Sequence, residues 1–190
     1  FHIVDIILIR EEVAGTVFQH TCFMIYAFTE LKMRIDKVRL YILGDVDDPE
    51  YKEECVQLIE MLGVKDIIFT GPVNVVEYME KFDFTILTSI SEGQPLSVLE
   101  SFAAARPAVT TDVGCCRELI YGRTQDELGQ AGFLVPPMHR EELANAMERM
   151  CLDTEMRNKM GAIAQKRVER YYTHEISMNQ YRELYKEVIM

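Results

Sequence analysis

Six short apolar runs in this sequence alternate with stretches in which apolar residues recur at helical spacing. The apolar runs are rich in β-branched residues, which predicts strands that are buried on both faces. Strands that alternate with helices predict βαβ units, and therefore one parallel sheet with helices on both faces. We predict an α/β chain with a Rossmann-like, three-layer parallel sheet and extra C-terminal helices.

The predicted elements can be placed along the chain from their periodicity and from the turn residues between them. The strands are predicted at residues 3–9, 38–43, 67–70, 84–87, 107–110 and 132–135. The helices are predicted at residues 17–32, 50–62, 75–81, 96–105, 116–121, 141–151, 154–171 and 174–190. Gly63 follows the second helix and suits the left-handed position that often ends one.

Length and charge limit the classes of protein to consider. The 190 residues suffice for one domain with a real core, and 48% hydrophobic and 27% charged residues are ordinary for a soluble protein. A formal net charge of −11 argues against a nucleic-acid partner, whose backbone requires a basic face. Because Phe1 opens directly into a strand-like run without an initiator Met, we expect a piece of a longer chain.

The cysteines indicate a reducing setting. There are five, an odd number, and none forms a zinc-type CxxC or CxH pattern. We therefore expect neither zinc nor a disulfide framework, and a cytoplasmic location. Cys115 and Cys116 are adjacent, and they are either a reactive vicinal pair or two small residues packed at the start of a helix.

The stretch 89–100 joins the fourth strand to the next helix and reads Ser-Ile-Ser-Glu-Gly-Gln-Pro-Leu-Ser-Val-Leu-Glu. A polar turn between a strand and a helix is where an open α/β sheet builds a ligand site. Pro95 suits the first helical position. The free N–H groups near Gln94, Leu96 and Ser97, together with the helix dipole, predict an anion site.

Two acids flank this predicted anion site. On a helix, Glu100 shares a side with Leu96 and Ala103, and we expect the packed face to carry Leu96, Leu99 and Ala103. A carboxylate bordering that face needs a hydrogen-bond partner, such as a ligand hydroxyl; the alternative is a solvated glutamate at the helix rim. Glu92 either faces the same cleft or is a simple loop acid.

Two other sites can be weighed from the sequence. Asp45 and Asp47 resemble an acid pair that holds a metal–diphosphate, but Asp is also favoured before a helix, so we predict no metal. Only Gly15 occurs between the first strand and the first helix, which argues against a dinucleotide-binding G-x-G-x-x-G loop.

The motifs together resemble a known family. The Glu-x7-Glu pattern in 89–100 resembles the donor-site signature of retaining glycosyltransferases of family 4, which have the GT-B fold. Residues 103–120, 69–71 and 132–137 also look like that family's motifs, in the right order. Residues 47–51 and 73–75 resemble one branch, the PelF-like transferases of pellicle polysaccharide synthesis. The resemblance covers about residues 34–190.

The resemblance implies that residues 1–190 are the C-terminal, nucleotide-sugar-binding half of a two-domain enzyme whose N-terminal acceptor domain is absent from this chain. Glu100 would hold the ribose, and Glu92 would act at the donor sugar with Arg10 on the diphosphate. The remaining donor-site residues would be Gly44, Gly71, Val73, Ser91, Gly93, Gln94, Pro95 and Leu96.

The same resemblance implies UDP-glucose as donor, a glycan or polysaccharide as acceptor and no metal or other cofactor. Its own N-terminal domain and a membrane-associated synthase complex would be its protein partners.

One departure from the family keeps two alternatives open. The family usually has a lysine shortly after the arginine of the first loop, but no lysine occurs between Arg10 and Lys32, and Glu11 and Glu12 stand there instead. The chain could thus be a catalytically degenerate nucleotide-sugar-binding module. A nucleotide-sugar epimerase domain of the same GT-B architecture is the other alternative.

Overall fold

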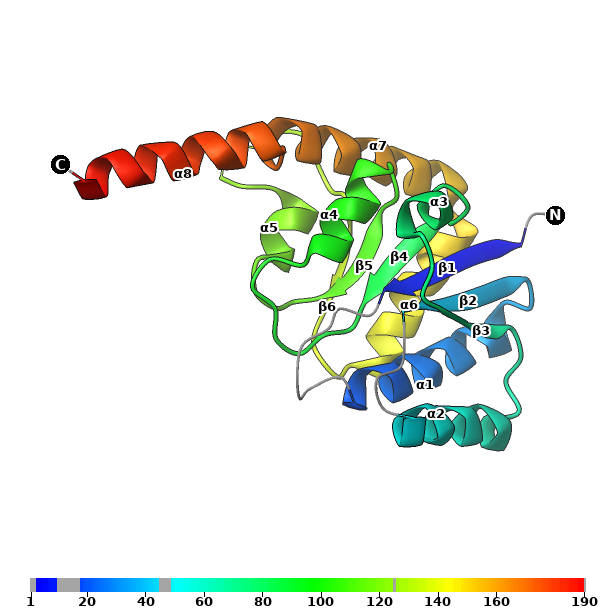
Figure 1. Cartoon of the computed structure of the whole chain (residues 1–190). Helices are drawn as coiled ribbons and strands as arrows, with labels where there is room; N and C mark the ends of the chain where they lie inside the picture. Colours follow the sequence, from blue (N-terminus) through cyan, green and yellow to red (C-terminus); the bar gives the residue numbers. More distant parts are fainter. Residues whose placement is uncertain (1–2, 10–17, 45–48, 125, 190) are drawn as a thin grey trace.

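The computed structural model describes residues 3–9, 18–44, 49–124 and 126–189. Within these ranges, six strands form one sheet in the order β3-β2-β1-β4-β5-β6, and all neighbouring strands are parallel (Figure 1). The strands are β1 (Val4–Ile9), β2 (Val38–Leu43), β3 (Ile67–Gly71), β4 (Phe84–Leu87), β5 (Ala108–Thr111) and β6 (Gly132–Val135). The predicted Rossmann-like sheet is confirmed.

The helices of the described ranges also follow the predicted order. They are α1 (Phe18–Arg34), α2 (Pro49–Leu62), α3 (Val75–Met79), α4 (Leu96–Ala103), α5 (Cys116–Tyr121), α6 (Arg140–Leu152), α7 (Thr154–Tyr171) and α8 (His174–Ile189). The helix predicted to end at Ala105 ends at Ala103. The reason is that Ala105 has a φ of 56°, in the left-handed region that an α-helix cannot use.

Helices cover both faces of the sheet (Figure 1). On one face, α1 and α6 pack on the strands through buried side chains such as Phe28 and Met147, and α2 lies beside α1. On the other face lie α3, α4, α5 and the later part of α7. Successive residues of β1 divide between the two layers, because side chains alternate along a strand: Ile6 joins the α1–α6 cluster and Ile7 the α3 cluster.

The two last helices differ in how they are held. α7 packs against α4 and α5, with Ala164 fully buried between them. α8 extends away from the sheet in Figure 1, and its side chains Tyr181, Leu184 and Tyr185 are exposed. Across the described residues, no helix combines the length and the apolar character that crossing a bilayer demands.

The sheet order reverses direction between β1 and β4. From β1 the chain adds β2 and β3 on one side, then returns to place β4, β5 and β6 on the other. In open parallel sheets, ligands bind at the carboxyl ends of the strands where the order reverses in this way. The loops after β1 and β4 are therefore the expected place for a ligand in this fold.

Candidate functional site

The turn between β4 and α4 lies at this reversal point. β4 pairs with β1 on one side and β5 on the other, so the turn begins at the carboxyl edge in the middle of the sheet. Ser91, Gly93 and Gln94 are exposed to solvent, whereas Pro95 is buried. The turn is thus a supported loop whose tip faces outward, as a ligand site requires.

The first turn of α4 presents its backbone amides at this edge. Pro95 is the residue before the helix, and its side chain makes no capping hydrogen bond. The sequence-based placement of Pro95 as the first helical residue is therefore wrong by one position, because its ψ of 115° is extended and the helix begins at Leu96. The first amides of a helix lack intrahelical partners and carry the positive end of its dipole, so this end of α4 can bind an anion.

The packed face of α4 agrees with the predicted one at Leu99, which is half-buried against the core, but not at Leu96 and Ala103. Its buried side chains are Ser97, Val98, Ser101 and Phe102. Leu96 is 66% exposed, and Glu100 and Ala103 are also exposed. The hydroxyl of Ser101 explains part of the difference, since it shares a hydrogen bond of 2.8 Å with buried Thr85 of β4 and so turns this side of the helix inward. Glu100 consequently lies on the solvent face, one turn after Leu96.

The Glu92 carboxylate acts electrostatically on Cys115 and Cys116, at the start of α5. One of its carboxylate oxygens, Oε1, is fully shielded from solvent. Burial raises the pKa of the Cys115 and Cys116 thiols, and the negative charge of Glu92 raises both further. Both cysteines are free, Cys116 is buried, and Cys115 immediately precedes α5. The structure therefore favours the packed reading of this pair over the reactive one.

The loop before α5 supports the backbone of the β4–α4 turn. The amide of Cys115 donates a 3.1 Å hydrogen bond to the carbonyl oxygen of Gly93. Gly114 has a φ of 50°, and a Cβ placed on it would overlap the carbonyl oxygen of Glu92 and lie 2.8 Å from its carbonyl carbon. No local pattern assigned a role to Gly114, although a glycine between a strand and a helix is itself a turn signal.

The other predicted donor-site residues lie at the same carboxyl edge, on the far side of β1. The amide of Gly44 donates a 3.3 Å hydrogen bond to the carbonyl oxygen of Gly71, which joins the ends of β2 and β3. Val73 is half-buried and packs beside Leu43 and Met79. Arg10, Asp45 and Asp47 fall outside the described residues.

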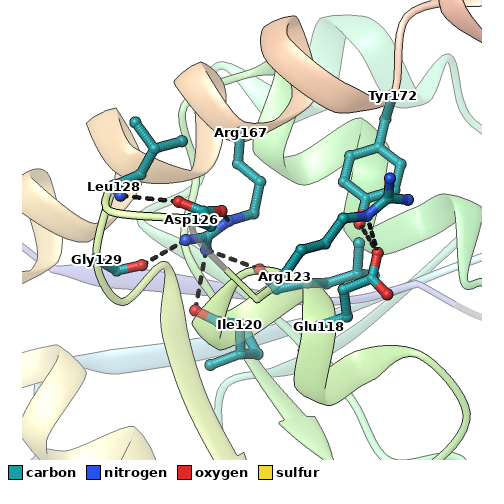
Figure 2. A network of polar contacts seen from close by, with 9 residues as sticks. Glu118, Ile120, Arg123, Asp126, Leu128, Gly129, Arg167 and Tyr172 are labelled. Atoms are coloured by element: carbon teal, nitrogen blue, oxygen red, sulfur yellow. Dashed lines mark hydrogen bonds and ion pairs between the residues drawn. The ribbon is translucent and has the colours of Figure 1, made fainter.

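A polar network anchors α5 to α7 behind the site (Figure 2). Oε1 of Glu118 in α5 accepts hydrogen bonds of 2.6 Å from the Arg123 guanidinium and 2.6 Å from the Tyr172 hydroxyl. Hydrogen bonding to Tyr172 is the main reason that the pKa of Glu118 lies below its usual range, and Arg123 adds to it.

Beside this group lies a buried ion pair. Nε of Arg167 lies 2.8 Å from Asp126 Oδ2, and their side chains are only 1% and 0% exposed. Arg167 also donates to the carbonyl oxygens of Leu119 and Ile120 at the end of α5. Sequence patterns gave no sign of this network, because its members lie up to 54 residues apart.

The sequence of the chain matches one family. Residues 14–153, well over half of the chain, match the family described as glycosyl transferases group 1. The chain belongs to this family. It is 27% identical over 168 residues to N-acetyl-alpha-D-glucosaminyl L-malate synthase of Bacillus anthracis. The aligned region covers 87% of this chain but only 42% of that enzyme. The chain thus spans less than half the length of this relative.

Solved structures agree on the fold. The C-terminal domain of LpcC, a group 1 glycosyl transferase of Francisella tularensis, has a TM-score of 0.73 at 23% identity, covering 89% of this chain and 86% of that one. Anabaena HepE, solved in complex with UDP-glucose, has a TM-score of 0.76 at 21% identity, covering 95% of this chain and 48% of that one. The sheet is therefore that of a GT-B C-terminal domain.

Proposed function

We propose that this group 1 glycosyl transferase chain binds the donor in a retaining, family 4 enzyme that moves a hexose from UDP-glucose to a glycan or polysaccharide. The observation that carries the proposal is the β4–α4 turn, which sets a helix N-terminus and two acids at the reversal point of the sheet. Nucleotide ligands bind at that point in folds of this kind. The solved UDP-glucose complex of HepE supports the choice of donor.

In this proposal Glu100 and Glu92 contact different parts of one ligand. Glu100, exposed one turn into α4, accepts hydrogen bonds from the ribose hydroxyls. The amides from Gly93 to Leu96 and the positive end of α4 hold the diphosphate, and Glu92 with Ser91 lies at the donor sugar. Gly44, Gly71 and Val73, across β1, contact the nucleoside, and Arg10 adds a cation to the diphosphate.

The reaction breaks the bond between the anomeric carbon and the UDP oxygen. Negative charge grows on the leaving diphosphate, and fixed amide dipoles at α4 stabilise that charge without reorganising. The acceptor then attacks from the face that UDP leaves, so the stereochemistry is retained. We propose that no metal takes part, since helix dipole and arginine supply the positive charge.

The remainder of the enzyme belongs to the same proposal. The match to only 42% of the Bacillus anthracis relative supports a longer parent protein, in which an N-terminal domain positions the acceptor. We place that parent in the PelF-like branch, in the cytoplasm and within a membrane-associated synthase complex. The branch assignment rests on residues 47–51 and 73–75.

Calorimetric titration with UDP tests the donor site. We expect UDP to bind, and Glu100→Ala to weaken binding roughly 10- to 100-fold, because a charged acceptor for two hydroxyls is lost. Glu60→Ala is the matched control: Glu60 is also an exposed helical glutamate, but it lies at the far end of α2. Absence of heat at millimolar UDP would refute the donor site, and unchanged affinity in Glu100→Ala would refute the role of Glu100.

A binding module without transfer is the second candidate, and the missing lysine between Arg10 and Lys32 favours it. Turnover of UDP-glucose by the parent protein separates the two. Release of UDP that depends on acceptor supports the transferase. Tight UDP binding without any turnover supports the module. The chain alone should transfer no sugar in either case, because the acceptor side is absent.

A further inference from the structure

Two cysteines from neighbouring helices face each other at the α1–α2 contact. Sγ of Cys22 in α1 lies 3.8 Å from Sγ of Cys55 in α2, although they are 33 residues apart in sequence. The hydroxyl of Tyr51, one turn before Cys55, accepts a 3.3 Å hydrogen bond from the amide of Cys22. Apolar packing by Ile25 and Leu58 continues the contact along both helices.

The two thiols differ in their exposure to solvent. Cys22 is partly exposed, whereas Cys55 is buried with 1% of its surface accessible. The facing Cys55 thiol is the main cause that lowers the pKa of Cys22 below 9.0; burial opposes it and the Tyr51 hydroxyl supports it. Burial raises the pKa of each of Cys115, Cys116 and Cys151. Thiolate is the nucleophilic form, so Cys22 is the cysteine set to react first.

We propose that Cys22 and Cys55 form a reversible disulfide that locks α1 to α2, with a small-molecule disulfide such as oxidised glutathione as the oxidant. The Cys22 thiolate attacks one sulfur of glutathione disulfide, whose S–S bond breaks and releases one glutathione thiolate. Cys55 then loses its proton and attacks Sγ of Cys22, which releases the second glutathione thiolate. The protein loses two electrons and two protons, and two glutathione thiols are formed.

The surroundings suit this chemistry. A disulfide needs its sulfurs at about 2.0 Å, and the 3.8 Å separation already places the two thiols in van der Waals contact. α1 follows β1 and α2 follows β2 in the chain, so the link would join the helices of the first two βα units. The inference does not depend on the donor assignment.

Mass spectrometry after alkylation tests the proposal directly. The reduced chain is incubated with oxidised glutathione, alkylated and digested. We expect a cross-linked peptide pair that contains Cys22 and Cys55, and its loss on treatment with dithiothreitol. Cys115→Ser is the matched control, because it removes another partly exposed thiol and should leave the link unchanged.

Single variants distinguish a disulfide from simple surface reactivity. Cys55→Ser should leave a stable glutathione adduct on Cys22, and Cys22→Ser should leave Cys55 unmodified. The oxidised wild-type chain should melt about 5 °C or more above the reduced chain, since the link closes a long loop of the unfolded state. Full alkylation of both thiols after oxidation, or a persistent glutathione adduct on wild-type Cys22, would overturn the proposal.

Discussion

The carbonyl oxygen of Gly93 accepts a 3.1 Å hydrogen bond from the amide of Cys115, which joins the turn after β4 to the turn after β5. Gly114 stands next to this bond, with its Cα against the backbone of Glu92. The proposed donor turn is thus held by backbone contacts from the next βα unit. A ligand site that must hold its amides in place benefits from such support, because preorganised donors need not rearrange on binding.

Gly114→Ala should disturb this support. Its Cβ would overlap the Glu92 carbonyl oxygen, so we expect a loss of about 3 kcal/mol in the free energy of unfolding and roughly 10-fold weaker UDP binding. Gly63→Ala is the control, since its φ of 61° is similarly left-handed but nothing lies within 4 Å. That variant should lose only about 1 kcal/mol and no affinity. Equal effects of the two variants in urea unfolding and calorimetry would contradict the supporting role.

Asp126→Ala should destabilise the chain strongly. It leaves the Arg167 guanidinium buried without its carboxylate, which costs about 3–5 kcal/mol. The control is Glu183→Ala, which breaks an exposed pair with Lys186 whose side chains are 67–69% exposed and should cost less than about 1 kcal/mol. Urea unfolding measures both. A loss below about 1 kcal/mol for Asp126→Ala would show that the buried pair does not hold α5 to α7.

Lowering the pH should destabilise the chain, because it protonates the carboxyl groups of Glu118 and Asp126 in the network between α5 and α7. The pKa of Glu118 is lowered, chiefly by Tyr172, and that of Asp126 is lowered because hydrogen bonds from Arg167 and Leu128 outweigh its burial. The folded state therefore binds fewer protons than the unfolded state near the ordinary pKa values. Their stabilisation is complete above about pH 5 and is lost as the pH falls below about 4.

Tyr172→Phe measures how much of this dependence of stability on pH is due to Glu118. Removing the hydroxyl that donates to Glu118 should cost about 1 kcal/mol at neutral pH. The difference from wild type should shrink as the pH falls through the lowered pKa of Glu118, because the hydroxyl then no longer faces a charged carboxylate. Urea unfolding between pH 3 and 7 measures it, and a difference that does not change with pH would refute the assignment.

Ala105→Gly should stabilise the chain. Ala105 has a φ of 56°, which costs a residue with a side chain about 1–2 kcal/mol, partly offset by the entropy that glycine adds to the unfolded state. We expect a net gain of up to about 1 kcal/mol. Ala104→Gly, at a φ of −83°, should instead destabilise by about 0.5–1 kcal/mol. Thermal melts of both variants decide the matter, and a lower Tm for Ala105→Gly would contradict the strain.

The fold class and the order of the elements could be predicted from local sequence patterns alone. Strong β-branched runs and helical periodicity are local signals, so β4, α4 and the turn between them were predicted almost to the residue. The motif that contains Glu92 and Glu100 led to the family for the same reason, because all its members lie within one short segment. The predicted ends of α4 differ from the observed ones because Pro95 and Ala105 have backbone angles that do not fit an α-helix.

Contacts between elements distant in sequence set the buried face of α4 and the polar and thiol pairs, which local patterns leave open. The packed face of α4 was predicted correctly at Leu99 but wrongly at Leu96, which lies outward. Small polar Ser97 and Ser101 lie inward instead, because packing on β4 rather than residue polarity sets the buried face. The Gly114 contact, the Arg167–Asp126 pair and the facing thiols of Cys22 and Cys55 join residues far apart in sequence. Such contacts exist only after the sheet has closed, because no local periodicity specifies which distant residues will meet.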